Sequence, residues 1–78
     1  MLDVRLREYL REVDVTGYRL AKMLNLRTPY VYNVLNGKLD KVPLYAKVVL
    51  ADHIGAPYVV CPVYVLGRWK LRLDVEEI

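Results

Sequence analysis

The chain has 78 residues, 55% of them hydrophobic and 27% charged, a composition typical of one small globular domain. Its net charge of +3 is compatible with a polyanionic partner but does not require one. The single cysteine, Cys61, excludes an internal disulfide and a cysteine-based metal cluster and indicates a reducing, cytoplasmic setting, and we expect neither a membrane-spanning helix nor a signal peptide.

The first part of the chain has apolar residues at helical spacing. A helix is predicted over residues 3–13, with charged residues between the apolar positions Leu6, Tyr9, Leu10 and Val13. Thr16 is a candidate N-cap for a second helix over residues 17–24. The small residue Ala21 lies in the middle of its apolar face, where it would let another helix approach closely. Asn25 follows, and asparagine tolerates the left-handed conformation that ends many helices.

The next stretch, RTPYVYNVLNG, fits both a strand and a helix. Val31 and Val34 favour a strand, which Asn-Gly at the end would close with a turn. Thr28 and Pro29 favour a helix start, with a capping hydroxyl followed by proline at the first helical position. A strand would place the two valines on opposite faces, whereas a helix collects the apolar residues in one stripe. We therefore predict a helix, with a stripe formed by Val31, Val34 and Leu35.

A loop and a further helix follow. Gly37 is a candidate helix terminus, and residues 38–41 form a loop with two lysines. Pro43 opens a helix over residues 44–54, which Gly55 ends. Its apolar positions are spread widely around the helix, so we expect it to be deeply buried or to serve two surfaces.

The tail changes character. Residues 58–65 are rich in β-branched and aromatic side chains, and residues 69–75 alternate apolar and polar, which predicts a hairpin with a two-residue turn at Gly67-Arg68. In that register Leu66 pairs with Trp69, and Tyr64 pairs with Leu71. One face then gathers large apolar side chains, which we expect to form a dimer contact: Tyr64, Leu66, Trp69, Leu71 and Leu73.

A short helix with a small mid-face residue, a tight turn and a second helix with a narrow apolar stripe form the pattern of a helix-turn-helix. In the DNA-binding version, the second helix needs an apolar side to dock on the first helix and a polar side to meet base edges. The two helices predicted on either side of Asn25 satisfy both requirements, because the tyrosines and asparagines of the second lie away from its stripe.

The sequence also resembles the Cro and phage-repressor (XRE-type) family of DNA-binding proteins. The resemblance covers residues 4–55 and rests on TGYRLAKMLNLRTPYVYNVLNG followed by KLDKVPLYAKVVLADHIG. It includes the Leu-Ala pair of the second helix, two apolar residues three apart in the recognition helix and the Asn-Gly that ends it, here Leu20-Ala21, Val31 with Val34, and Asn36-Gly37. The resemblance implies a mainly α fold: a compact four-helix, lambda-repressor-like helix-turn-helix core over residues 1–56 and a C-terminal β-hairpin or strand within residues 57–78.

Three departures from the family pattern stand out. Gly17 replaces a glutamine that often reaches a phosphate, although its backbone N–H at a helix start can still meet one. Asn25 stands where glycine commonly ends the first helix of the motif. The tail reads as β where many relatives have a fifth helix, and the Cro branch uses a C-terminal strand to dimerise. By this analogy the tail is a packing or dimerisation element of the same domain.

The resemblance implies a sequence-specific, double-stranded-DNA-binding transcriptional regulator, dimeric on a palindromic operator. Matched by position, the residues that read bases are Arg27, Thr28, Pro29, Tyr32, Asn33 and Asn36. Those that position phosphates are Thr16, Gly17, Tyr18, Arg19, Lys38 and Lys41. The chemistry agrees, because Asn33 can pair with adenine N6/N7 and Arg27 with guanine O6/N7. We expect no cofactor, metal, membrane or small-molecule effector as a partner.

Other interpretations stay open. The chain has no serine, one histidine and no Gly-rich phosphate loop, so it offers no catalytic site. A helix-turn-helix can also serve as a scaffold for protein interaction, as in antitoxins or phage proteins that bind host machinery, and its tyrosines would suit a protein groove. Asn36 also fits a simple helix terminus, and Tyr30 the edge of the core. Lys70 and Arg72 fit a solvated hairpin face better than a second DNA surface.

Overall fold

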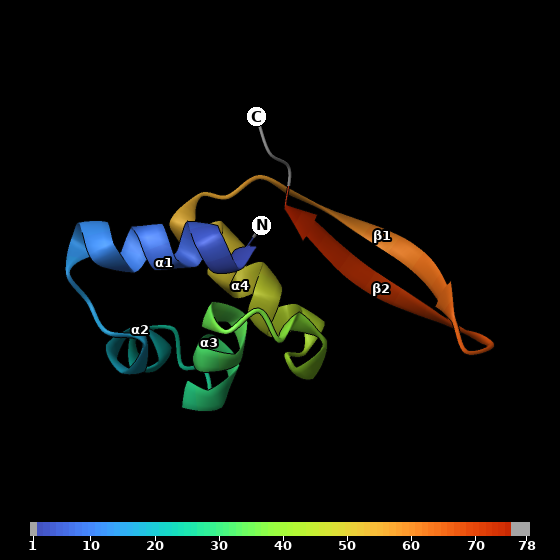
Figure 1. Cartoon of the computed structure of the whole chain (residues 1–78), viewed down its shortest axis with the longest axis horizontal. Coiled ribbons are helices and arrows are strands. Elements are labelled where there is room, and N and C mark those ends of the chain that lie inside the picture. Colours follow the sequence, from blue (N-terminus) through green and yellow to red (C-terminus); the bar gives the residue numbers. More distant parts are fainter. Residues whose placement is uncertain (1, 76–78) are drawn as a thin grey trace.

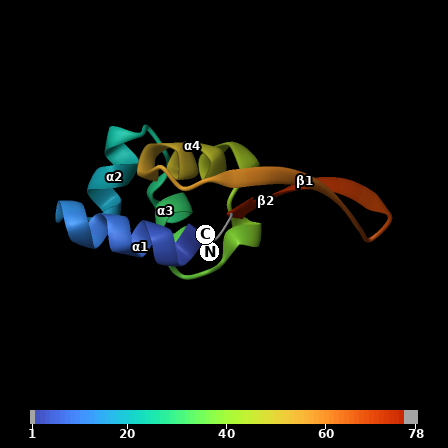
Figure 2. The same cartoon turned by 90° about the horizontal axis from the view of Figure 1, so that it is seen from above.

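The chain folds into a helical body from which a β-hairpin projects (Figure 1). The computed structural model describes residues 2–75 and contains four α-helices, one 3₁₀ turn and one antiparallel two-stranded sheet. In chain order these are α1 (Leu2–Val13), α2 (Gly17–Met23), α3 (Thr28–Leu35), η1 (Leu39–Lys41), α4 (Leu44–Ile54), β1 (Tyr58–Val65) and β2 (Arg68–Val75). Seen from above, α3 lies between α1 and α4, and the hairpin extends past the helices (Figure 2).

Local capping sets the helix ends close to where the sequence predicts them. The Thr16 hydroxyl accepts a hydrogen bond from the Arg19 backbone N–H at 3.2 Å, which confirms Thr16 as the N-cap of α2. Asn25 adopts φ +55° directly after this helix, as expected for a left-handed terminus. Gly55 ends α4 with φ +72°, a conformation in which a Cβ would be strained.

The stretch that fitted both a strand and a helix is a helix. Val31 and Val34 are fully buried, and they share the core with Ala21 of α2. The start differs by one residue from the prediction, because Arg27 is the N-cap and makes no side-chain capping hydrogen bond. Thr28 is the first helical residue, so its hydroxyl does not cap α3.

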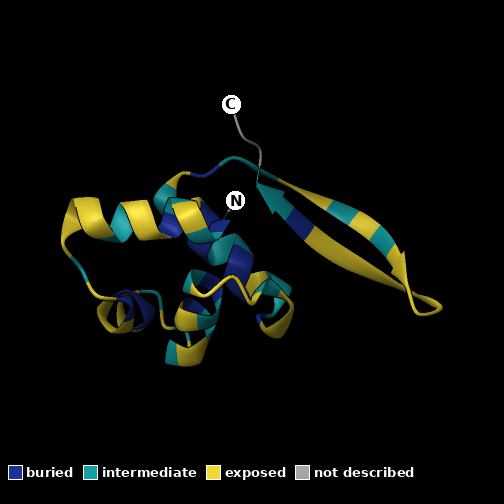
Figure 3. Ribbon diagram, in the orientation of Figure 1, coloured by how far each residue is buried: buried dark blue, intermediate teal, exposed yellow. Residues whose placement is uncertain are grey.

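The core lies where the four helices meet, and burial is concentrated on their inner faces (Figure 3). Two polar contacts tie α1 to its neighbours. Arg7 donates a hydrogen bond to the carbonyl of Leu35 at the end of α3, at 2.8 Å. The Tyr9 hydroxyl lies 3.0 Å from His53 Nε2 near the end of α4, with the two rings edge to face. The fully buried large side chains are Leu2, Leu6, Leu20, Val31, Val34 and Leu50.

The hairpin turn is one residue earlier than predicted. Val65 pairs with Arg68, so Leu66 and Gly67 form the two-residue loop, with φ values of +53° and +75°. A two-residue hairpin loop of type I′ requires positive φ at both positions and strongly favours glycine at the second, which places Gly67 second rather than first. The predicted pairs of Leu66 with Trp69 and of Tyr64 with Leu71 are therefore wrong. Tyr64 pairs with Trp69 instead.

Pro62 is compatible with this register. Hydrogen-bonded and non-hydrogen-bonded pairs alternate away from the turn, and the pair of Pro62 with Leu71 is of the second kind. The missing N–H of proline therefore faces the outer edge of β1, and the hairpin loses no internal hydrogen bond. The outer edge of β1 is thereby less suited to pair with another strand, whereas β2 contains no proline.

The register changes the predicted dimer surface. Leu66 belongs to the turn rather than to the apolar face and is 95% exposed. Leu73 is only 6% exposed, because it is part of the core of its own chain, so it is not available to a second copy. Tyr64, Trp69 and Leu71 remain as exposed members of the predicted face.

Tyr58, Leu73 and Val75 pack the base of the hairpin against the helical core. A hydrogen bond with Asp52 at the end of α4 is the main cause that raises the pKa of the Tyr58 hydroxyl at the start of β1. Desolvation and the negative charge of Asp52 act in the same direction. The hairpin is thus tied at its base while its distal part is exposed (Figure 3).

Candidate nucleic-acid interface

The packing of α2 against α3 determines which residues of α3 face outward. Ala21 contributes the small side chain at the contact, and Val31 and Val34 dock there. On the remaining surface of this segment, Tyr32 is exposed and Asn33 is partly buried. The other predicted base-reading residues are also accessible, with Arg27, Pro29 and Asn36 exposed and Thr28 partly buried.

Gly17 and Tyr32 occupy one site between the two helices. A Cβ at position 17 would lie 3.2 Å from Tyr32 Cζ and 3.3 Å from Val31 Cγ1. Gly17 is buried in this packing, so the predicted phosphate contact at this position is not accessible. Its role is to make room for the tyrosine ring at the start of α2. The sequence shows that the glutamine side chain of the family is missing here. It does not show that the Tyr32 ring lies against this position.

The exposed start of α2 carries three of the predicted phosphate residues. The Thr16 oxygen accepts the capping hydrogen bond, which leaves its hydroxyl proton for an outside acceptor. Tyr18 and Arg19 are exposed, and the Lys22 ammonium lies 4.8 Å from the centre of the Tyr18 ring. This cation–π contact orients a tyrosine hydroxyl and a positive charge on the same short helix.

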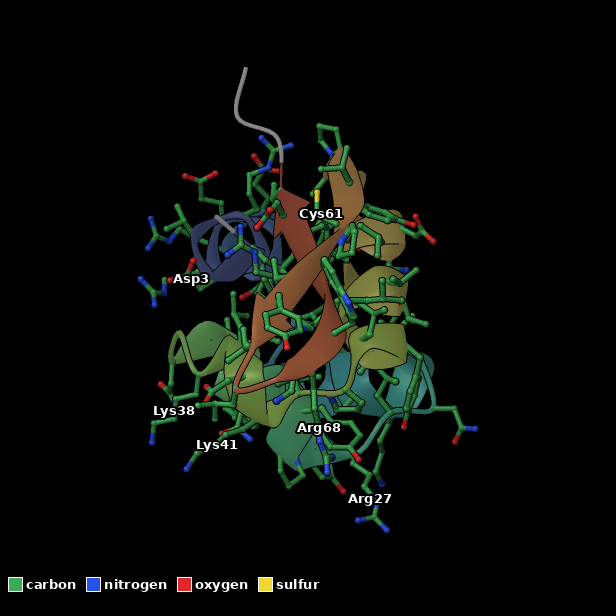
Figure 4. All side chains as sticks on the ribbon, turned by 90° about the vertical axis from the view of Figure 1, so that its right-hand side faces the viewer. Asp3, Arg27, Lys38, Lys41, Cys61 and Arg68 are labelled. Carbon is green, nitrogen blue, oxygen red and sulfur yellow. The ribbon has the colours of Figure 1, made fainter. Side chains whose placement is uncertain are left out.

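Basic residues are concentrated in the segment that contains α2, α3 and η1. Residues 15–51 include six lysines and arginines but one acid, Asp40, although the whole chain has a net charge of only +3. Lys38, the N-cap of η1, and Lys41, its last residue, are both exposed. In the view along the long axis, Arg27, Lys38 and Lys41 extend from the same side of the molecule (Figure 4). A positive surface of this kind attracts a polyanion.

Tyr45 is a candidate site residue that the sequence did not single out. It lies in the first turn of α4, is 59% exposed, and its ring centre is 6.3 Å from that of Tyr30 in α3. Desolvation, and then a hydrogen bond with Tyr30, raise the pKa of Tyr45, while the positive charge of Arg27 acts in the opposite direction. The signal available in the sequence was a large aromatic residue in the exposed first turn of a proline-initiated helix.

Comparisons with known proteins and searches of the described residues for other kinds of site were negative. Comparisons of the chain with protein-family models, with curated proteins and with solved structures returned no match. Within residues 2–75, no group of three or more His, Cys, Asp or Glu side chains is arranged to hold a metal ion. No helix in the same range is long and apolar enough to cross a membrane. Accessible amide, hydroxyl and cationic groups lie together on and around α3.

Proposed function

We propose that this protein is a sequence-specific, double-stranded-DNA-binding transcriptional regulator of the Cro and phage-repressor type. In this proposal α2 and α3 form the helix-turn-helix, and α3 enters the major groove. The observation that carries it is the division of α3 into two sides: buried Val31 and Val34 dock on α2, and polar and aromatic side chains stay accessible between cationic flanks.

The proposed roles follow from the chemistry of the accessible groups. Asn33 would read adenine and Arg27 guanine through paired hydrogen bonds, while Tyr32 and Pro29 would offer apolar contact to a thymine methyl. Thr28 and Asn36 would complete the base-reading set. The residues that would hold the phosphate backbone are Thr16, Tyr18, Arg19, Lys38, Lys41 and, from the start of α4, Tyr45.

A homodimer on a palindromic operator is the assembly we propose. Exposed Tyr64, Trp69 and Leu71 support contact between two hairpins, since large apolar side chains are seldom left uncovered together. With Pro62 on the outer edge of β1, the β2 edge is the one suited to pairing with a second copy. Two copies of α3 about 34 Å apart would read successive major grooves. The dimer would act in the cytoplasm by occluding its site, without a cofactor or small-molecule effector.

Selection of bound duplexes from a genomic library tests this function. The expected result is an enriched inverted repeat that keeps its affinity near physiological salt. Asn33→Ala should relax preference at one base position, with a loss of about 1–3 kcal/mol at the preferred base, while Lys38→Ala should weaken all sequences alike. Absence of a preferred sequence, together with loss of binding at physiological salt, would contradict the proposal. Equal effects of the two variants on every sequence would contradict the division of roles.

The exposed hairpin favours one alternative function, a protein-interaction module on a helix-turn-helix scaffold. Trp69 and Leu71, 71% and 58% exposed, would suit a protein partner as well as a second copy. Sedimentation with and without a mixed-sequence duplex separates the two functions. A monomer that ignores DNA supports the interaction module, and a dimer that binds the duplex supports the regulator.

A further inference from the structure

The tip of the hairpin lies on the same side of the molecule as the cations around α3. In the view along the long axis, Arg68 extends toward the side from which Arg27, Lys38 and Lys41 project, whereas Cys61 lies on the opposite side (Figure 4). The hairpin is remote from α3 along that axis (Figure 1). The positive side chains on this side are therefore distributed along the length of the protein.

The local geometry fixes Arg68 at the tip. The two-residue turn at Leu66 and Gly67 makes Arg68 the first residue of β2, and it is exposed. Farther along the strand, Arg72 is held by Asp74 at 3.0 Å. Among residues 2–75, no acidic side chain forms an ion pair with Arg68. Its charge is thus available to an outside anion, whereas Arg72 is already paired with Asp74.

We propose that the hairpin tip is a second DNA contact, in which Arg68 binds backbone phosphates outside the major groove that α3 enters. This inference rests on the proposed function. The protein measures 42 Å along its longest axis, which exceeds the length of about 34 Å for one turn of duplex DNA. A duplex aligned with that axis presents phosphates to both ends of the same protein surface. Arg68 would displace counterions there and add affinity without reading sequence.

Arg68 is a better candidate for this contact than its neighbours at the tip. Leu66 is exposed but has no charged side-chain group that could pair with a phosphate. The hairpin can serve both roles, because its apolar side chains and the tip cation are distinct groups. Tyr64, Trp69 and Leu71 remain available to the second copy while Arg68 faces the duplex side.

The test measures binding of the enriched duplex, and of a scrambled duplex, over a series of salt concentrations. Arg68→Gln should reduce the slope of log affinity against log salt by about one per protomer and weaken both duplexes by a similar factor of about three to ten. Arg68→Lys should restore most of the slope. Arg11→Gln is the matched control, because it removes the same charge from an exposed position on α1, and it should leave the slope unchanged.

Three results would overturn the contact, and they are distinguishable from failure of the proposed function. If Arg68→Gln behaves like Arg11→Gln while Lys38→Gln lowers the slope, the tip does not touch DNA although the regulator proposal stands. If sedimentation shows that Arg68→Gln dissociates the dimer, and this dissociation accounts for the loss of affinity, the tip contacts protein rather than DNA. If the unmodified protein prefers no duplex, the regulator proposal itself fails and this inference fails with it.

Discussion

At the scale of single residues, the most informative pair is Gly17 and Tyr32. Glycine is a poor choice for the first turn of a helix on propensity alone, since its backbone loses more conformational freedom than alanine does. Here the absence of a Cβ lets the Tyr32 ring lie against the start of α2. The same ring is on the accessible side of α3, so one small residue sets the position of a candidate DNA-contacting side chain.

A double-mutant cycle tests this coupling. In the Tyr32→Ala background, Gly17→Ala should be better tolerated, because the closest contact of the new methyl is gone, although those with Val31 and Leu35 remain. In the unmodified protein the same substitution should be less favourable by about 1 kcal/mol, the size typical of coupled neighbours. Denaturant unfolding of the four proteins gives the coupling energy directly. Additive effects within error would mean that the ring moves aside freely.

At the residue level, features that depend on neighbouring residues in the chain could be predicted from the sequence, and features that depend on tertiary contacts could not. Thr16 and Asn25 were predictable because capping and left-handed termini depend on the residue and its immediate neighbours. The buried role of Gly17 and the pairing of Tyr30 with Tyr45 were not, because each depends on which helices meet in space. The accessibility of the α3 side chains agrees with the predicted apolar stripe, while their contact with DNA stays a prediction.

At the scale of elements, the hairpin is the segment whose local sequence fits its geometry least. Leu66 adopts φ +53° in the turn, a conformation that is unfavourable for a bulky side chain and is normally supplied by asparagine or glycine. The side chain is 95% exposed, so no packing within the chain compensates. This mismatch also explains the error in the predicted turn, since leucine is not a residue that favours turns and Leu66 was assigned to the strand.

Leu66→Asn should therefore stabilise the folded chain. It would create the Asn-Gly pair favoured in this turn and relieve a left-handed leucine, a gain of about 1 kcal/mol. Thermal or denaturant unfolding at low protein concentration measures the effect on the single chain. Leu66→Ala serves as the control, because it removes the same apolar surface without supplying the turn preference. No difference between the two variants would count against backbone strain at this position.

The base of the hairpin should respond to alkaline pH through Tyr58. Its folded-state pKa is raised above the usual value of 10.0, chiefly by the hydrogen bond with Asp52. A raised pKa contributes stability that is present below the unfolded value and is lost as the pH rises through the folded value. The stability of the unmodified protein relative to Tyr58→Phe should thus be constant near neutral pH and fall above about pH 10. Parallel pH profiles for the two proteins would exclude this tie.

Periodicity was sufficient for the helices but not for the hairpin register. Each helix has about two or three turns, so one ambiguous residue changes little. Pro43 and Gly55 bound the predicted helix over residues 44–54, and its ends match α4. A two-residue turn depends on a single dipeptide, and choosing Gly67-Arg68 shifted every cross-strand partner. Each residue pairs with a partner two residues away from the predicted one, as Tyr64 does with Trp69 instead of Leu71. Since side chains alternate between the two faces, Tyr64, Trp69 and Leu71 still share one face.

At the scale of the whole molecule, charge and exposed apolar surface lie on different parts of the chain. The basic excess is carried by the segment from α2 to α4, while Tyr64, Trp69 and Leu71 lie on the projecting hairpin. The hairpin could fold back on its own body only by closing the groove beneath it. That groove is about 660 Å³ in volume, and apolar residues, Leu71 of the hairpin among them, line it together with the charged side chains Asp40, Lys47, Lys70, Arg72 and Asp74. Tyr64 and Trp69 do not line this groove, and a second copy is the cover that we propose for them.

Leu71→Lys tests whether hairpin contact and DNA affinity are linked. Leu71 is exposed, so the substitution should leave the single chain folded, but it places a charge in the proposed dimer contact, where an unpaired buried cation is strongly unfavourable. Sedimentation should show a monomer where the unmodified protein is a dimer. Affinity for an inverted repeat should fall toward that for a half-site, because the second α3 no longer binds as part of the same particle.

Met23→Lys is the matched control, since it makes the same kind of change at an exposed position on α2, away from the hairpin. It should leave the sedimentation of the free protein unchanged. If both variants sediment as dimers, the hairpin face is not the contact. If Leu71→Lys is monomeric yet binds the inverted repeat with full affinity, dimerisation and recognition are independent. Only joint loss of the dimer and of the preference for the repeat over a half-site connects the apolar hairpin to the basic surface around α3.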